Sequence, residues 1–402
     1  MESGLRQRLP SSLLKRRLRR EDPIMKRLFL YLLLILCLVF GLAACTKPTE
    51  DAPETPGIAD VGIIHEPEFG GVYITNTIEE FNAKGFAYGD SVDVSFSNGY
   101  KLEDLPYYNG YYVQTGEPLL IAYPGYDYIK AAINNGDDLW VVAGLSETDT
   151  ASVTLREAGK YKDIQEARDI HYKDDRSLFE SDEVFANFRD MRTSGLRSGV
   201  LYRSASPCDN QHNRAPFVDA LIQNAGVQYI LDLADTPEKI EVYMAKEDFA
   251  SPYFASLYEN GCVDPIGLNM NFGSEEFRGK IAAGLTRMAE ADGPYLIHCT
   301  EGKDRTGFVC MLLEALCGAP YDEIRDDYMI TYDNYYQISP EKDSARYSTI
   351  VENVLDPMIR SMAGDEALDL QNADLSKAAE NFLLSGSMKT EAIEALKAKL
   401  ME

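Results

Sequence analysis

The stretch HCTEGKDRTG, residues 298–307, brings a cysteine, a lysine, an arginine and two glycines together. It follows the apolar run Tyr295–Ile297 and leads into an apolar stretch that ends at Leu316, so its context is strand, loop and helix. The backbone N–H groups of such a loop and of the helix start converge on one point, which favours an anion. Cys299 stands at the strand end beside that point, where thiols ionise readily. The stretch therefore predicts a nucleophilic thiolate that faces a bound anion.

Arg305 follows Cys299 at a spacing that suits the recognition of a phosphoryl group. Its planar guanidinium can bind two phosphoryl oxygens by paired hydrogen bonds, which lysine does poorly. The same Cys-x5-Arg spacing recurs at Cys208 and Arg214, but that copy follows Pro207 and contains no glycine. We interpret it as a loop without a preceding buried strand. The spacing alone is thus weak, and the strand, loop and helix context carries the prediction.

The whole stretch resembles the signature loop of the cysteine-dependent protein tyrosine phosphatases, in particular the bacterial branch with HCxxGKDRTG. The segments NFRD at 187–190 and GVLYRSA at 199–205 are similar to two further elements of that family. Asp232-Leu233 with Glu238 resembles its D-L-R-x-x-x-E element, although Ala234 stands where arginine is usual. The resemblance covers about residues 180–402.

The resemblance implies an α/β fold, in which a tyrosine-phosphatase-like sheet is flanked by helices. It also implies metal-independent hydrolysis of phosphotyrosine, and of phosphoserine or phosphothreonine as further candidates, through a cysteinyl-phosphate on Cys299. Arg305 would stabilise the transferring group and Asp304 would act as the general acid, with no cofactor. Thr306 would donate a hydrogen bond to the cysteine sulfur. The expected phosphate-binding residues are Thr300, Glu301, Gly302, Lys303 and Thr306.

Several roles stay open at this point. Asp304 could instead only cap the helix, and Asp232 and Asp264 are weaker candidates for the general acid. His298 is expected to orient the loop by bonding its backbone. Lys303 adds positive charge at the mouth, whereas Glu301 replaces the commoner alanine and disfavours a densely phosphorylated substrate.

Two other functions compete with a phosphatase that acts on phosphorylated proteins or small phosphomonoesters. One is a phosphoinositide or inositol-phosphate phosphatase, because the loop chemistry is shared. The other is a surface binding protein whose phosphatase fold is vestigial and whose β region, with an unknown ligand, carries the function.

The elements around the loop divide the chain in two. Short alternating runs bounded by turn residues predict a β-rich domain over 61–165, and strands alternating with helices predict the catalytic domain over 166–402. The expected strands of the first domain include a run at 139–143, and Asn109-Gly110 is expected to turn a hairpin. In the second domain we expect strands at 227–233 and 295–298, and helices at 275–290, from about 305 to 316, and at 390–400.

The N-terminus predicts export and lipidation. Residues 1–24 hold seven Lys or Arg, and Met25 is the expected true start, followed by a long apolar stretch that ends Leu42-Ala43-Ala44-Cys45. This ending resembles a bacterial lipobox, so residues 1–44 would be a leader, Cys45 the lipid attachment site, and 45–60 a linker rich in Pro, Thr and acidic residues. The prediction is an extracytoplasmic protein, lipid-anchored to a bacterial cell membrane; a plain signal peptide or a single membrane anchor are the alternatives.

Charge and cysteine content exclude some classes. Residues 1–44 contain nine of the 39 Lys and Arg and three of the 65 Asp and Glu, so the remainder has a formal net charge of about −32. Such a surface repels nucleic acid. The cysteines at 208, 262, 299, 310 and 317 have the spacing of neither a disulfide scaffold nor a zinc site, which predicts no bound metal.

Overall fold

The computed structural model of this protein describes residues 55–401. The predicted leader over 1–44, Met25 and Cys45 lie outside the described residues, as does most of the predicted linker. Within the described part, no helix has both the length and the apolar character that crossing a bilayer requires.

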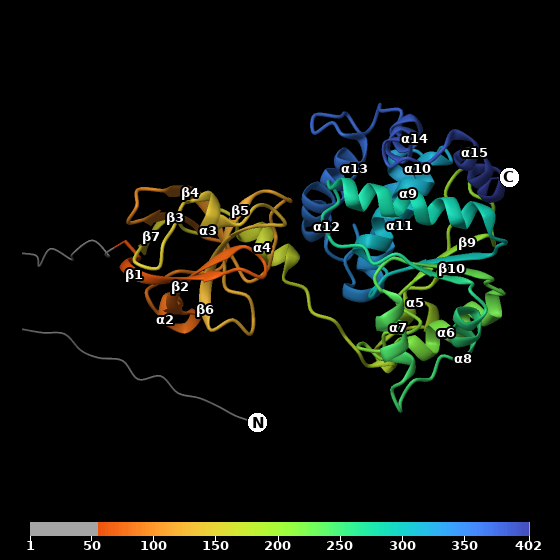
Figure 1. The fold of residues 1–402 in the computed structure, drawn as a ribbon, viewed down its shortest axis with the longest axis horizontal. Helices are drawn as coiled ribbons and strands as arrows, with labels where there is room; N and C mark the ends of the chain where they lie inside the picture. The colour runs from red at the N-terminus through yellow and green to blue at the C-terminus, as the bar shows by residue number, and fades with distance from the viewer. Residues whose placement is uncertain (1–54, 402) are drawn as a thin grey trace, which may run out of the picture. The chain divides into compact units, whose positions relative to one another are not determined.

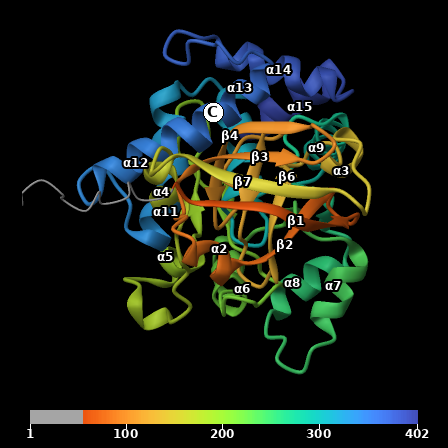
Figure 2. The ribbon, with the colours of Figure 1, turned by 90° about the vertical axis from the view of Figure 1, so that its left-hand side faces the viewer.

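The first part of the described chain is a closed barrel. Figure 2 looks onto it, with β1, β7 and β3 side by side, as their antiparallel pairing requires. β1 begins inside the segment predicted to be a linker. The strands in barrel order are β1 (Gly57–Glu66), β2 (Gly71–Thr77), β6 (Tyr128–Ile133), β5 (Pro118–Ile121), β4 (Lys101–Tyr108), β3 (Ser91–Phe96) and β7 (Thr150–Glu157).

Alternation of apolar and polar residues builds this barrel. In β3, Val92, Val94 and Phe96 are buried in the barrel core, whereas Asp93 and Ser95 between them are half-buried. A period of two puts alternate side chains on opposite faces of a strand, so one face fills the interior. Short helices lie beside the strands: α2 (Ile78–Ala83), α3 (Leu139–Val142) and α4 (Lys162–Arg168).

Two expectations for this region are wrong. Residues 139–143 form the helix α3 rather than a strand, because the Asp138 side chain caps it by accepting the Trp140 N–H at 2.9 Å. Asn109-Gly110 does not turn a hairpin, since β4 runs parallel to β5, which it could not do after a two-residue turn. The Asn109 side chain instead accepts a hydrogen bond from Gln165 Nε2 at 2.7 Å, which holds the loop.

The second part of the chain is built on a sheet in the order β11-β10-β12-β9-β8. All neighbours are parallel except β8, which is antiparallel to β9. Parallel strands end at one edge of a sheet, so Ser204, Asp232 and His298 lie in register at that edge. The strands are β8 (Arg189–Asp190), β9 (Leu201–Ser204), β10 (Tyr229–Asp232), β11 (Val263–Pro265) and β12 (Tyr295–His298).

Helices cover both faces of this sheet, as the sequence predicted (Figure 1). Tyr295 and Ile297 pack into the core that contains α9, α10, α14 and α15, whereas Leu296 between them packs against α6 and α8. The helical segments are η1 (Arg176–Leu178), α5 (Asp182–Ala186), α6 (Ala215–Ala225), α7 (Pro237–Met244), α8 (Pro252–Glu259), α9 (Glu275–Glu290), α10 (Asp304–Leu316), α11 (Tyr321–Tyr336), α12 (Ser344–Ile350), η2 (Val351–Leu355), α13 (Asp356–Ala363), α14 (Leu375–Ser385) and α15 (Thr390–Leu400).

The elements around the predicted loop are confirmed. β12, α9 and α15 have the predicted bounds, α10 starts at Asp304, and β10 is a shorter part of the predicted strand at 227–233. The copy of the spacing at Cys208 is a loop, as predicted, but the buried strand β9 does precede it. That copy therefore lies at the same edge of the sheet as Cys299.

Candidate active site

The loop between β12 and α10 turns its carbonyl groups away from the space in front of it. From Cys299 to Gly302 every backbone carbonyl accepts a hydrogen bond from a group behind or beside the loop. A peptide unit whose C=O points backward presents its N–H forward, so this arrangement exposes a row of donors. The four donors or donor pairs are His298 Nδ1 to Cys299 O at 3.3 Å, Ser206 N to Thr300 O at 3.1 Å, Tyr335 Oη to Glu301 O at 2.8 Å, and Arg203 Nη2 and Asn187 Nδ2 to Gly302 O at 3.0 and 3.1 Å.

The start of α10 adds to this row. Its N-cap residue, Lys303, makes no side-chain capping bond, so the first N–H groups of the helix are not bonded by the N-cap side chain. The partial positive charge of a helix start favours an anion at this point. α10 is buried from Thr306 to Leu316, which fixes the helix in the core. Cys299, only 3% exposed, lies directly after β12 at the base of the loop.

A buried ion network holds the back of the loop. Asp327 on α11 accepts from Arg189 Nε and from Arg203 Nη1, each at 2.8 Å. Burial alone would raise the pKa of Asp327, but the two guanidinium groups outweigh it and lower that pKa. Arg203 also bonds the Gly302 carbonyl, and Arg189 bonds the Asn187 side chain at 2.8 Å. The segments 187–190 and 199–205, which resemble two elements of the family in sequence, thus support the loop from behind.

Arg305 lies in the first turn of α10 and bonds a side chain of the loop. Its two terminal nitrogens donate to Leu268 O at 3.2 Å and to Thr300 Oγ1 at 3.3 Å, while its buried Nε has no partner among the described residues. A fork held in this way keeps donor capacity for a planar or tetrahedral oxyanion. The Thr306 hydroxyl, also predicted to act here, is buried and without a partner in the described structure.

A model of the tyrosine phosphatase family matches residues 183–402, more than half of the chain. The chain belongs to the tyrosine phosphatase family. The matched segment begins within α5 and contains the whole loop described above, whereas the barrel lies outside it.

The relatives match only over short stretches or with low identity. A tyrosine-protein phosphatase of Nostoc commune is 46% identical over 56 residues, and a predicted tyrosine-protein phosphatase of Cupriavidus necator is 47% identical over 47 residues. These matches span 14% and 12% of this chain, and 18% and 17% of the relatives' own length. Among solved structures, the core catalytic domain of the PP-IP phosphatase SIW14 of S. cerevisiae, solved with citrate, is 20% identical, with a TM-score of 0.24; the match covers 46% of this chain and 96% of that one.

Charged and aromatic side chains form the mouth of the phosphatase loop. Lys303 Nζ lies 3.4 Å from Glu301 and 3.8 Å from Asp304, and it donates to the Tyr172 hydroxyl at 2.8 Å. The Tyr172 hydroxyl in turn donates to Glu301. Burial would lower the pKa of Lys303, yet the two carboxylates raise it well above its usual value, while burial raises the pKa of Glu301. The ring of Tyr172 packs on His212, with centroids 4.6 Å apart.

The three candidate carboxyl groups for proton transfer occupy different places. Asp304 lies in the first turn of α10 with its side chain 30% exposed, beside Lys303 at the mouth. Asp264 pairs with Arg287 Nε at 2.8 Å, which occupies it. Asp232 is fully buried at the end of β10. Of the three, only Asp304 combines access to solvent with a position in the loop.

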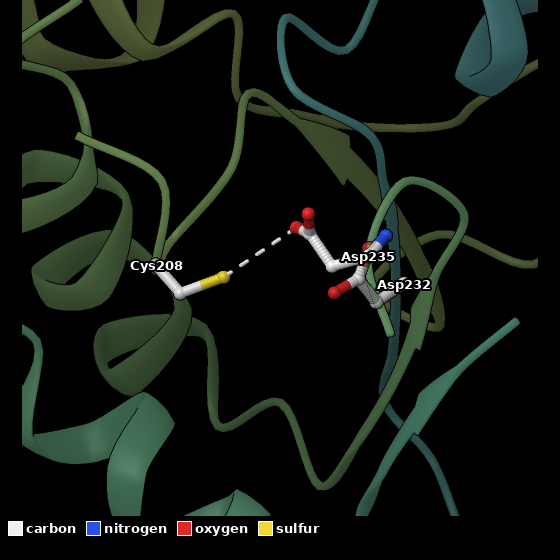
Figure 3. Close-up of side chains that lie close together, drawn as sticks. All are labelled: Cys208, Asp232 and Asp235. Carbon is white, nitrogen blue, oxygen red and sulfur yellow. Dashed lines mark hydrogen bonds between the residues drawn. The ribbon is translucent and has the colours of Figure 1, made fainter. Parts of the chain in front are cut away.

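A buried polar cluster lies beneath the loop. His298 is fully buried, and burial lowers its pKa to about 4. Burial also raises the pKa of Asp232 and that of Asp235 to about 6, and it raises the pKa of the Cys208 thiol well above its usual value. Figure 3 shows the Asp235 carboxyl group facing the Cys208 sulfur, 3.9 Å away.

Sequence reasoning missed three of the residues placed here. Tyr172 reaches the loop from a segment 129 positions earlier, and no spacing pattern connects the two. Tyr335 and Asp327 lie on one face of α11, where they look like ordinary helix positions. The sequence signal for Asp327 is an aspartate on the apolar face of a helix. A buried aspartate needs a charged partner, and here its partners are two arginines.

Proposed function

We propose that this member of the tyrosine phosphatase family hydrolyses phosphotyrosine monoesters through a cysteinyl-phosphate on Cys299, with phosphoserine and phosphothreonine esters as further candidates. The observation that carries the proposal is the orientation of the loop: four successive carbonyls are held from behind, so the N–H groups face the space in front of Cys299. Such preorganised donors stabilise the charge of a transferring phosphoryl group without reorganising during the reaction.

The first step forms the covalent intermediate. The Cys299 thiolate attacks phosphorus, the S–P bond forms, and the bond from phosphorus to the phenolic oxygen breaks. Asp304 gives its proton to that leaving oxygen, because it lies in the first turn of α10 and is partly open to solvent. The loop amides and Arg305 hold the three equatorial oxygens throughout.

The second step releases phosphate. Water attacks phosphorus and passes a proton to the Asp304 carboxylate, while the S–P bond breaks and its electron pair returns to sulfur. The buried Thr306 hydroxyl has no other partner among the described residues, so it is free to donate to the sulfur as it leaves. No metal ion takes part in either step.

The experiment is phosphate release from an aryl phosphate by the purified full chain, with EDTA present. We expect turnover in the native chain, none in Cys299→Ser, and nearly native turnover in Cys262→Ser, whose thiol lies away from the loop and contacts Asn260 O. Cys299→Ser should still bind inorganic phosphate. Turnover that survives in Cys299→Ser, or no turnover in folded native protein across a range of pH both with and without EDTA, would reject the cysteine mechanism.

Asp304→Asn tests the general acid. We expect it to slow esters with poor leaving groups by roughly 10²-fold to 10⁴-fold and to change activated aryl phosphates much less, because an activated phenolate needs no proton. If both ester classes slow equally, Asp304 does not donate the proton.

Thr306→Val tests the second step separately. Valine keeps the side-chain volume but has no hydroxyl to donate to the departing sulfur. We therefore expect a rapid burst of phenol followed by slowed turnover, as the cysteinyl-phosphate accumulates. Loss of the burst together with the steady rate would mean that the hydroxyl serves the first step or the fold.

The anchor at Cys45 is a proposal that rests on the sequence alone. Mass spectrometry of membrane-extracted protein should find Cys45 as an acylated N-terminal residue, and Cys45→Ala should release the chain from membranes. An uncleaved leader in the extracted chain would indicate a membrane anchor instead.

A further inference from the structure

Three side chains that could bind a metal meet under the phosphate loop, and His298 lies beside one of them. Cys208 lies in the loop after β9, Asp232 ends β10, Asp235 follows it in the next loop, and His298 ends β12. One ligand atom from each of Cys208, Asp232 and Asp235 lies within 4.8 Å of the other two (Figure 3). The sequence spacing predicted no metal set, because these residues come from three separate stretches.

The cluster is enclosed, and its hydrogen bonds are incomplete. Cys208 and Asp235 are 3% exposed, and Asp232 and His298 are 0% exposed. Asp232 Oδ1 accepts the N–H groups of Ala234 and Asp235 at 2.9 and 3.2 Å, but its Oδ2 has no partner among the described residues. A buried carboxylate oxygen without a donor or cation is costly, so this orphan points to a missing positive charge.

His298 supplies a second buried acceptor, next to Asp232 Oδ2. Its Nδ1 lies 3.3 Å from the carbonyl oxygen of Cys299, which can only accept, so Nδ1 carries the hydrogen. In the neutral ring Nε2 is then the unprotonated nitrogen, and it is buried without a partner in the described structure. It lies 3.9 Å from Asp232 Oδ2, which is also an acceptor. Two acceptors that face each other inside a protein need a cation or a proton between them.

We propose that Cys208, Asp232, Asp235 and His298 bind one Zn²⁺ ion. Zinc bonds of about 2.0–2.3 Å in a tetrahedron put the ligand atoms roughly 3.3–3.8 Å apart. The two measured pairs, Cys208 Sγ to Asp235 Oδ2 and His298 Nε2 to Asp232 Oδ2, are each 3.9 Å apart. The ligand atoms of Cys208, Asp232 and Asp235 lie within 4.8 Å of one another, so these three need a contraction of about 1 Å to close around the ion. His298 is outside that set and neighbours Asp232 alone, so its approach to the ion is part of the proposal.

The donor set selects the metal. A thiolate and an imidazole disfavour Mg²⁺ and Ca²⁺, which take oxygen ligands, and four protein ligands with no open position describe a structural zinc site. The hydrogen bond from His298 Nδ1 to a backbone carbonyl is the outer contact that usually orients a zinc-binding histidine. The ion would join the loops after β9 and β10 to the end of β12, directly before Cys299. It would brace the phosphate loop and take no part in the reaction.

The competing explanation is a proton held by Asp232 Oδ2 and shared with His298 Nε2, with no metal. Cobalt distinguishes the two, because Co²⁺ bound to a thiolate gives a charge-transfer band in the near ultraviolet. The full chain, purified in detergent and stripped with chelator, is titrated with Co²⁺. We expect one Co²⁺ per chain with that band, displaced by one Zn²⁺. A folded native chain that shows no band would establish the shared proton and overturn the proposal.

Variants then identify the thiol. Cys208→Ser should lose the band and Cys299→Ser should keep it, while Asp235→Asn should weaken zinc binding by at least about tenfold. The reverse pattern, with the band kept in Cys208→Ser and lost in Cys299→Ser, would place the metal on the phosphatase nucleophile and overturn the proposal. The native chain supplies a measurement that needs no variant: Zn²⁺ at about 100 times its Kd should raise Tm by about 5–10 °C. No rise in Tm at saturating Zn²⁺ would also contradict a zinc ion that stabilises the loop.

Discussion

Replacing Gly302 by alanine should damage the phosphate loop far more than the same replacement at a matched glycine. Gly302 has a φ of +67°, and a Cβ there would lie 2.2 Å from the Ser204 carbonyl oxygen and 2.5 Å from its carbon. Gly226, at the end of α6, has a φ of +68° with nothing within 4 Å of a Cβ. The two positions therefore share a left-handed φ, but a Cβ meets other atoms only at Gly302.

The magnitudes follow from this difference. A left-handed φ costs a residue other than glycine about 1–2 kcal/mol, so Gly226→Ala should lose about that much. At Gly302 the strand end cannot yield, and overpacking adds about 1–3 kcal/mol. A displaced loop also leaves the buried donors of Arg203 and Asn187 without the Gly302 carbonyl, at about 1–3 kcal/mol for an unsatisfied buried group. We expect a total loss of about 3–8 kcal/mol for Gly302→Ala.

Urea unfolding of the full chain, followed by circular dichroism, measures both losses. Aryl phosphate turnover, measured where each variant is still folded, should fall by more than about 100-fold in Gly302→Ala and stay near native in Gly226→Ala, since misplaced donors no longer match the transferring group. Equal destabilisation by the two variants would refute the reasoning, because it would mean that the approach to Ser204 costs nothing.

Two further substitutions test the charges around the loop. Asp327→Asn should cost about 3 kcal/mol at neutral pH, because Arg189 and Arg203 lose their shared buried partner. Because the folded-state pKa of Asp327 lies below its ordinary value of 3.8, this contribution is present above that pH and is lost as pH falls through the lowered pKa, so native and variant stabilities should converge in acid. Glu301→Gln should lower the inhibition constant of inorganic phosphate by about 3-fold to 10-fold. The Glu301 carboxylate lies 3.4 Å from Lys303 Nζ, and without its negative charge the ammonium group attracts phosphate more strongly. An unchanged inhibition constant would mean that Lys303 does not reach the bound anion.

The sequence predicted the loop and its flanking elements because that information is local. A short, continuous apolar run marks β12, a capping serine and helical spacing mark α9, and α10 follows directly from the loop. The strand expected at 139–143 is wrong because branched apolar residues favour a strand, while one aspartate before them caps a helix. Local propensity determines the secondary structure of such a segment only when no capping side chain favours a different backbone conformation.

The contacts that complete the site are not local. Tyr172 and Asp327 reach the loop or its supporting arginines from segments more than 120 positions away in sequence, and the cluster under the loop joins the ends of three strands. Cysteine spacing excludes only metal sites whose ligands are close in the chain, so the set of Cys208, Asp235 and His298 could not be seen before the sheet order was known.

The same arrangement explains why the loop depends on residues that never touch a substrate. Its amide groups point forward only because its carbonyls are bonded from behind, and the donors come from β9, β12, α11, the loop after β9 and the segment at 187–190. The Glu301 carbonyl has one such side-chain donor, the Tyr335 hydroxyl, so removing that hydroxyl leaves the carbonyl unsatisfied and frees the peptide unit to rotate its N–H away from the anion. Substitutions at such positions should therefore lower kcat by misplacing donors, even where the free energy of unfolding changes little.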